Sequence, residues 1–269
     1  MKIFRTLLSM SSSTIGGEQP AYREYRPSAR LVKFVECFWT HETVGKTVHR
    51  VLPDGCVDLL LTRTGAVSNE LIVVGTMTRA RLFDLPQAKL IGVRFRPGMS
   101  FLFVPVPGPE LVDQRIPLHE IWGPKANQLR EQLGDCSVLQ FIAKIETQLI
   151  EQLYAQPKGQ PFLNSTQRVL SWAEEQHGNV RIDDLADLAG LSARQFRRVC
   201  LELTGLTPKQ LCRAIRFRKA VAQLMNDGGL GSATIALDLG YYDQAHFINE
   251  FRAFSGLTPR EYCIDLARV

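Results

Sequence analysis

A stretch of basic and amide side chains in the C-terminal half carries the most specific chemistry in the sequence. In SARQFRRV (192–199), the polar positions that could face outward are Arg194, Gln195, Arg197 and Arg198. Arginine forms paired hydrogen bonds with guanine and glutamine with adenine, and both also bind phosphate oxygens. The apolar positions recur at helical spacing, at Phe196, Val199, Cys200 and Leu203. The stretch therefore predicts a helix with one buried face and one face suited to a nucleic acid.

This helix belongs to a unit that occurs twice. Residues 192–211 align with residues 243–262 at an offset of 51, and both copies contain Gly-Leu-Thr-Pro. Upstream, LADLAGL (185–191) matches IALDLGY (235–241) at an offset of 50. In each unit a glycine is placed to end the first helix, and a serine or an aspartate is placed to cap the second. Each unit is therefore predicted to be a helix-turn-helix.

The second copy offers fewer charged side chains than the first. After the capping residue Asp243, the outward positions are Gln244, Ala245, His246 and Asn249. From residue 164 onward the chain has 13 lysines and arginines against 12 aspartates and glutamates, so the overall charge does not indicate a nucleic-acid partner. A charged helix face is more often simply solvated. The prediction of a nucleic-acid partner therefore depends on the local cluster of basic side chains and on the tandem repeat in which it occurs.

Residues 165–264 resemble the DNA-binding domain of AraC/XylS-family bacterial transcription regulators. IALDLGYYDQAHFINEFRAFSGLTPREY (235–262) matches the second half of that family's signature closely. The resemblance implies two helix-turn-helix units, joined by one long helix over 208–225, that enter successive major grooves about 34 Å apart. It places the base-reading positions on Arg194, Gln195, Arg197, Arg198, Gln244, Ala245, His246 and Asn249. It also implies backbone contacts around Ser192 and Asp243.

Two residues depart from the family's pattern. Tyr242 stands where a serine commonly precedes the second recognition helix, which puts the capping contact of that helix in doubt. Asn249 stands where arginine or lysine is frequent, and Ala245 can offer only a methyl contact. We therefore expect the second unit to bind DNA less tightly than the first.

The first half of the chain shows strand patterns. TVHRVL (47–52) and CVDLLLT (56–62) flank Pro53-Asp54-Gly55, which predicts a β-hairpin. LIVVGTM (71–77) and KLIGVRF (89–95) predict two further strands. Less specifically, residues 31–123 resemble the β-rich sensor domain of some members of the same family. That resemblance implies a domain that senses a small molecule or dimerises, and it names no ligand.

Six residues of this half are candidates for an effector pocket: Trp39, His41, Arg50, Asp58, Arg94 and Arg96. Asp58 and Arg94 lie on strands whose alternate residues are apolar, so they face either a pocket or solvent. If two arginines line a pocket, an anionic ligand is the natural expectation.

These patterns together predict an α+β protein. We expect a β-rich N-terminal domain over 20–154, for which a cupin-like fold is one candidate, a linker over 155–163, and an all-α tandem helix-turn-helix domain over 164–269. The helix expected over 137–154 has an apolar stripe. This stripe either packs against its own β domain or forms the interface of a homodimer.

Composition and motifs limit the classes of function that the chain can have. The 269 residues carry a net charge of +5, 45% of them are hydrophobic, and no apolar run approaches the roughly 20 residues of a membrane span. We therefore expect a cytoplasmic protein without a membrane partner. The six cysteines form no CxxC pair, and the five histidines are scattered. Without catalytic motifs such as GxSxG or HExxH, we expect no enzyme, no cofactor and no metal.

The sequence thus predicts an effector-responsive transcription regulator, most simply an activator. Its expected partners are double-stranded DNA, RNA polymerase and an unidentified small molecule. The alternative is a thiol-reactive redox or alkylation sensor, or an enzyme, fused to the same DNA-binding domain. A reactive, exposed Cys56 would distinguish that alternative, whereas the commoner role of such a residue is that of a small buried hydrophobe.

Overall fold

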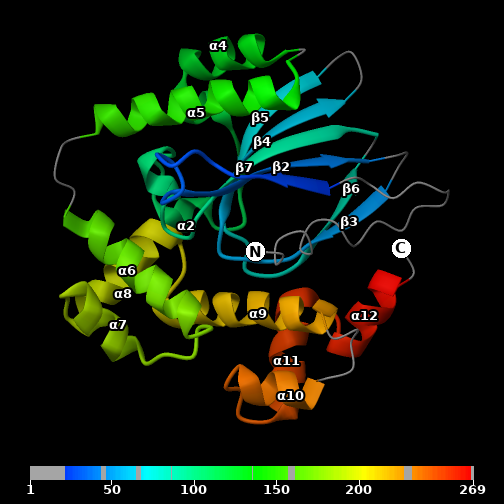
Figure 1. Cartoon of the computed structure of the whole chain (residues 1–269), viewed down its shortest axis with the longest axis vertical. Coiled ribbons are helices and arrows are strands. Elements are labelled where there is room, and N and C mark those ends of the chain that lie inside the picture. Colours follow the sequence, from blue (N-terminus) through cyan, green and yellow to red (C-terminus); the bar gives the residue numbers. More distant parts are fainter. Residues whose placement is uncertain are drawn as a thin grey trace.

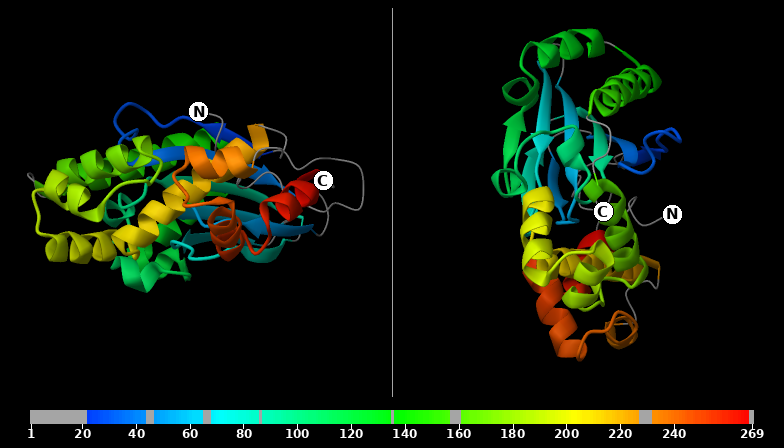
Figure 2. Two further views of the ribbon diagram at one scale, coloured as in Figure 1. Left: turned by 90° about the horizontal axis from the view of Figure 1, so that it is seen from below. Right: turned by 90° about the vertical axis from the view of Figure 1, so that its left-hand side faces the viewer.

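A β-rich part is followed by a helical part, which confirms the expected α+β class. The computed structural model describes residues 22–43, 47–64, 68–85, 87–134, 136–156, 161–226 and 232–267. The strands and the helices α4 and α5 lie at one end of the molecule, and helices α6 to α12 lie at the other (Figure 1). Two further views show the helical part on one side of the sheets (Figure 2). The narrower cupin-like description stays a prediction.

The larger sheet has six strands in the order β1-β2-β7-β4-β5-β8, and every neighbouring pair is antiparallel. Strand β4 lies inside this sheet, and its side chains at Leu59 and Leu61 are fully buried. The six strands are β1 (Tyr22–Tyr25), β2 (Val35–Glu42), β4 (Val57–Thr64), β5 (Ser68–Val74), β7 (Lys89–Phe95) and β8 (Arg115–Pro117).

A second sheet corrects the hairpin expected around Pro53-Asp54-Gly55. Strand β3 (Thr47–Val51) pairs with β6 (Arg81–Leu85), whereas β4 pairs with β5 and β7. The turn is present, since the Asp54 carboxylate accepts from the Cys56 amide at 2.9 Å and Gly55 has φ of +79°. The turn connects the two sheets. Strand β4 pairs inside the larger sheet because its apolar residues are more fully buried there.

The helices that come after β7 in the chain pack against one face of the larger sheet. They are the 3-10 helix η1 (Ser100–Leu102), α2 (Gly108–Leu111), α3 (Leu118–Trp122), α4 (Pro124–Leu133) and α5 (Val138–Ala155). The apolar stripe of α5, formed by Phe141, Ile145 and Leu149, is fully buried in the core of its own β domain. Of the two expected roles of this stripe, the structure thus shows packing against its own β domain, and a homodimer stays a prediction.

The second part of the chain is helical throughout, as its sequence predicts. Its elements are α6 (Pro161–Glu175), α7 (Ile182–Ala189), α8 (Ala193–Thr204), α9 (Pro208–Asn226), α10 (Ser232–Asp238), α11 (Gln244–Ser255) and α12 (Pro259–Ala267). Helix α9 runs beneath the sheets and joins the group α6–α8 to the group α10–α12 (Figure 1). Of the expected linker over 155–163, residues 157–160 lie outside the described residues. Among the described helices, none is long and apolar enough to cross a membrane.

The role of α5 can be tested by truncating its two faces separately. Phe141→Ala should lower the free energy of unfolding by about 3–5 kcal/mol, because it removes a fully buried aromatic ring. Leu139→Ala on the same helix should change it by less than about 0.5 kcal/mol, because Leu139 is 69% exposed. Urea denaturation measures both values. Equal, small effects of the two substitutions would show that the stripe is not packed inside the domain.

Candidate nucleic-acid interface and ligand cavity

The structure contains the two predicted helix-turn-helix units, α7–α8 and α10–α11. In each unit the turn begins at a glycine in the left-handed region, with φ of +69° at Gly190 and +68° at Gly240. Side chains with a Cβ rarely adopt this conformation, so the two glycines end α7 and α10 at equivalent points. The repeated sequence therefore has a repeated structure.

The same hydrogen bonds end both recognition helices, α8 and α11. The Thr204 hydroxyl donates to the Cys200 carbonyl at 2.7 Å and accepts from the Leu206 amide. The Ser255 hydroxyl, 51 residues later, donates to the Phe251 carbonyl at 2.8 Å and accepts from the Leu257 amide. The hydroxyl thus satisfies main-chain groups at the helix end in both units.

The first turns of α8 present the predicted basic side chains to solvent. Arg194, Arg197 and Arg198 are exposed, while Phe196 and Cys200 are buried in the core of the unit. Gln195 is also exposed, but its Oε1 accepts from the Ser192 amide at 3.0 Å and the Ser192 hydroxyl at 2.8 Å. These two residues form a capping box. The amide oxygen of Gln195 is therefore occupied, and the arginines are the freer groups for DNA.

The first turn of α11 is polar and capped. Asp243 accepts from the His246 amide at 2.7 Å, and His246 Nδ1 accepts from the Tyr242 amide at 3.3 Å. The capping contact that Tyr242 put in doubt is therefore supplied by Asp243. Three predicted contact residues of this helix are exposed without a described side-chain partner, namely Gln244, Ala245 and Asn249.

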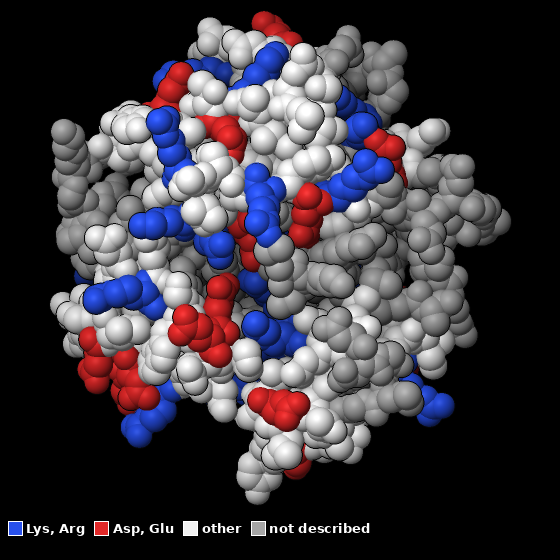
Figure 3. All heavy atoms as spheres, in the orientation of Figure 1, with Lys and Arg blue, Asp and Glu red and all other residues white. Residues whose placement is uncertain are grey.

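The arginines of α9 stabilise the domain rather than form a basic face. Arg213 pairs with the buried Glu250 of α11 at 2.7 Å, and Arg216 donates to the Gly178 carbonyl at 3.1 Å. Arg218 is 7% exposed and points toward the β-rich part. On the face shown in Figure 3, basic and acidic side chains are interspersed. The candidate DNA surface is thus defined by the first turns of α8 and α11.

A small cavity lies between the two sheets and has a volume of about 90 Å³. Its walls combine two histidines, two arginines, two aspartates, and apolar or aromatic side chains, and the lining residues come mainly from β2, β3, β4, β5, β6, β7 and β8. The residues that line it are Trp39, His41, His49, Val51, Asp54, Cys56, Asp58, Leu60, Val74, Gly75, Met77, Phe83, Leu90, Arg94 and Arg115.

The charged groups of this cavity are matched to one another. Arg94 is 2% exposed, and its guanidinium lies 3.3 Å from the Asp54 carboxylate and 3.1 Å from the Asp58 carboxylate. Trp39 Nε1 donates to Asp58 at 2.9 Å. Two carboxylates therefore face Arg94, whereas Arg115, the second arginine of the lining, lies over the Phe83 ring, 5.4 Å from its centroid. The expectation of an anionic ligand stays a prediction.

Two buried histidines form the most unusual pair in the cavity wall. His41 Nε2 and His49 Nε2 are 3.2 Å apart, so one of them donates and the other accepts. The pKa of both rings is lowered from 6.5 to about 4, mainly by burial, and the neighbouring His49 contributes to the lowering for His41. Both rings are therefore neutral at pH 7. His41 Nδ1 is buried and has no hydrogen-bond partner among the described residues.

Four of the six candidate effector residues meet in this cavity: Trp39, His41, Asp58 and Arg94. Arg50 faces the helical part instead, where it donates to the Ser255 carbonyl at 3.0 Å. Arg96 donates to the Val32 carbonyl and lines a different hollow. His49 also lines the cavity, although it is not among the six candidates predicted from the sequence. Its place on β3, next to Arg50, indicates that the two side chains point to opposite sides of the strand.

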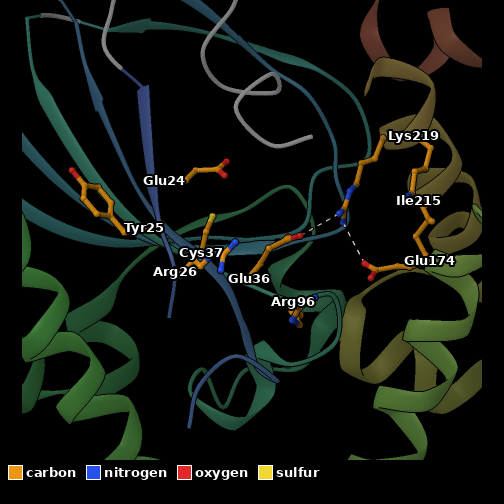
Figure 4. Close-up of a pocket in the computed structure, with 10 residues that line it drawn as sticks. Glu24, Tyr25, Arg26, Glu36, Cys37, Arg96, Glu174, Ile215 and Lys219 are labelled. Carbon is orange, nitrogen blue, oxygen red and sulfur yellow. Dashed lines mark hydrogen bonds and ion pairs between the residues drawn. The ribbon is translucent and has the colours of Figure 1, made fainter. Parts of the chain in front are cut away.

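The hollow that Arg96 lines has a volume of about 440 Å³ and lies between β1, β2 and helices α6 and α9. Glu36 from β2 and Glu174 from α6 point into it (Figure 4). Arg218 lies between them, 3.4 Å from Glu36 and 3.9 Å from Glu174. Burial raises the pKa of Glu36, and the charge of Arg218 opposes that effect. The Arg218–Glu36 pair joins the β-rich part to the helical part, and the Arg218–Glu174 pair lies within the helical part.

The structure does not favour a reactive Cys56. The residue is 3% exposed, and burial raises the pKa of its thiol well above the ordinary value. A thiol in this environment is poorly nucleophilic, since the thiolate is the reactive form. No group of three potential metal ligands occurs in the described part of the chain.

Comparisons with known proteins agree with this geometry. Residues 185–263 match a family described as a helix-turn-helix domain, and residues 23–117 match one described as a domain of unknown function (DUF6597). The HTH-type transcriptional activator RhaS of Escherichia coli O157:H7 is 32% identical over 102 residues, which are 36% of this chain and 36% of RhaS. An uncharacterized HTH-type transcriptional regulator of Haemophilus influenzae is 29% identical over 89 residues, 33% of this chain and 30% of the relative. The match thus spans about a third of the length of these curated relatives.

The C-terminal part of the chain carries a helix-turn-helix domain. Over this domain the chain is similar to HTH-type transcriptional regulators such as RhaS, which agrees with the AraC/XylS resemblance seen in its sequence. Among solved structures, ToxT from Vibrio cholerae O395 is 15% identical, with 93% of this chain and 98% of ToxT covered and a TM-score of 0.43. At that TM-score the likeness does not establish a shared fold.

The histidine pair predicts how stability depends on pH. In the unfolded chain both rings take up protons near pH 6.5, but in the folded chain they do so only near pH 4. The stability present above pH 6.5 should therefore fall as the pH drops from 6.5 toward 4, by about 1–2 kcal/mol for each histidine between pH 7 and pH 5.

Urea midpoints at pH 7 and pH 5 measure this loss. His41→Gln/His49→Gln should lose less stability over the same interval than the unaltered chain. An unchanged pH dependence in the double variant would contradict the assignment of neutral, buried rings.

Proposed function

We propose that the chain is an effector-responsive transcription activator that reads DNA with α8 and α11. The observation that carries the proposal is the repeated unit itself: two capped helices, each with an exposed polar first turn, on one helical domain. The RhaS proteins, which the C-terminal part resembles, are described as activators. As an activator it would contact RNA polymerase at the promoter and would work in the cytoplasm, where bacterial DNA lies.

The two recognition helices divide the reading of DNA unequally. Arg197 and Arg198 on α8 suit guanine edges or phosphates, since their guanidinium groups are exposed. Gln244 and Asn249 on α11 suit adenine, and Ala245 offers a methyl contact to thymine. Ser192, Gln195, Asp243 and His246 build the helix caps, so in our proposal they position main-chain amides for phosphate contacts. The first unit then supplies most of the electrostatic affinity.

The effector of this proposal binds in the cavity between the sheets. A volume of about 90 Å³ admits only a compact molecule, and the matched charges around Arg94 favour a neutral one. The buried His41 Nδ1 supplies a polar group for such a molecule. Residues that line the cavity alternate along the chain with residues that contact the helical part: His49 and Val51 alternate with Arg50 and Leu52. A molecule bound in the cavity would therefore contact a segment whose neighbouring residues contact the helical part.

The DNA-reading role predicts the effect of removing the α8 arginines. Arg198→Ala should weaken binding by about 1–3 kcal/mol and relax specificity at one position if Arg198 reads a guanine. If it contacts only phosphate, affinity should fall similarly on all sequences, with a shallower salt dependence. Genome-wide footprinting with the purified full chain at about 150 mM salt gives the sites.

The control for this experiment is Arg130→Ala, which removes an exposed arginine from α4 in the β-rich part. It should leave the footprints unchanged, whereas Arg197→Ala/Arg198→Ala should abolish them. Identical footprints from the double variant and the unaltered chain would contradict the proposed role of α8.

A further inference from the structure

The β-rich part contacts both recognition helices at the same point of the repeat. The Thr76 hydroxyl donates to the Thr204 carbonyl at the end of α8, at 3.1 Å. Arg50 Nη1 donates to the Ser255 carbonyl at the end of α11, at 3.0 Å. Thr204 and Ser255 are separated by the 51-residue offset of the repeat, so they are equivalent residues. Two different segments of the first domain therefore bind the same main-chain group in each unit.

Close packing surrounds each of these hydrogen bonds. At the end of α8, Gly108 and Gly205 touch through their backbones: a Cβ added at Gly108 would lie 2.2 Å from the Gly205 amide nitrogen. At the end of α11, the Ala80 amide donates to the Phe254 carbonyl at 2.7 Å, and Leu52 is buried in the core of the second unit. Both helix ends are thus held by main chain and buried side chains, not by exposed charges.

We propose that Arg50 and Thr76 are positioning residues for DNA recognition: through them the β-rich domain fixes the placement of one recognition helix relative to the other. Their contacts lie at the C-terminal ends of α8 and α11, whereas the polar residues suited to DNA lie at the N-terminal ends. The first domain can therefore hold both helices while their reading surfaces stay free. The inference rests on the proposed DNA-binding function.

The geometry of DNA makes this placement a determinant of specificity. Each added base pair moves one half-site about 3.4 Å along the duplex and rotates it about the axis. Helix α9 is the covalent connection between the two units, and the β-rich domain adds a second connection that contacts both. With both connections in place, only one half-site spacing fits the two helices. Without the contacts from the β-rich domain, the two helices can also bind half-sites at neighbouring spacings.

The test measures the preference for half-site spacing in the full chain. An operator is first selected from random DNA, and its half-sites are then moved one base pair closer together or further apart. We expect the unaltered chain to prefer its selected spacing at least tenfold in Kd. Arg50→Met/Thr76→Val should reduce this preference at least fivefold and leave the Kd for an isolated first half-site unchanged within twofold.

A matched control variant removes an arginine side chain and a threonine hydroxyl that make similar hydrogen bonds elsewhere in the first domain. Arg63 donates to the Leu133 and Cys136 carbonyls, and the Thr43 hydroxyl donates to the Ala88 carbonyl, all within the β-rich part. Arg63→Met/Thr43→Val should therefore keep the spacing preference of the unaltered chain. Equal preferences in the Arg50/Thr76 variant and in this control would overturn the inference.

A second variant keeps the test decisive if the Arg50/Thr76 variant does not fold. Gly108→Ala would place its Cβ against the Gly205 backbone and push the first unit away, whereas Gly134→Ala meets nothing closer than 3.4 Å. Only Gly108→Ala should relax the spacing preference, and an unchanged preference would again overturn the inference. Failure of the proposed function would look different, because the unaltered chain would then select no operator at all.

Discussion

The turn at Asp54 is held from both sides by buried arginines, and the two parts of the molecule meet there. The Asp54 carboxylate pairs with Arg94 of β7, while the Asp54 carbonyl accepts from Arg218 of α9 at 3.4 Å. Both arginines are nearly inaccessible to solvent, so each needs its partners to be stable there. The turn connects β3 to β4, which places the cavity wall and the contacts to α11 on one continuous segment.

This arrangement places the cavity beside main chain that contacts the helical domain. Gly75 and Met77 line the cavity, and Thr76 between them holds the end of α8. On β3 the same alternation places His49 toward the cavity and Arg50 toward α11. In the proposed function, an effector in the cavity would act on main chain that already contacts the recognition helices, so no long pathway would be needed.

The helical domain could be predicted from the sequence because its signals are local. Gly190 and Gly240 end helices through their own backbone conformation, and the caps at Ser192 and Asp243 involve residues three positions away. The prediction of a hairpin around Asp54 was wrong because strand pairing is not a local property. The pairing of a β-strand depends on the burial available across the whole sheet, and β4 is buried more fully between β5 and β7.

The candidate sites were predictable only in part. Strand alternation left Asp58 and Arg94 facing either a pocket or solvent, and the fold places both in the cavity wall. Asp54, which balances the charge of Arg94, lies on a turn outside that pattern. Likewise, the sequence placed arginines on α9 without showing that Arg213 and Arg218 are paired with Glu250 and Glu36. Such pairs join residues far apart in the chain, so only the fold reveals them.

A hydroxyl-radical footprint of the full chain on its selected operator would show whether both repeats read DNA from one face of the duplex. We expect two protected blocks about one helical turn apart, with the stronger block under the α8 unit. A single protected block, or uniform protection that does not depend on sequence, would rule out DNA recognition by both units.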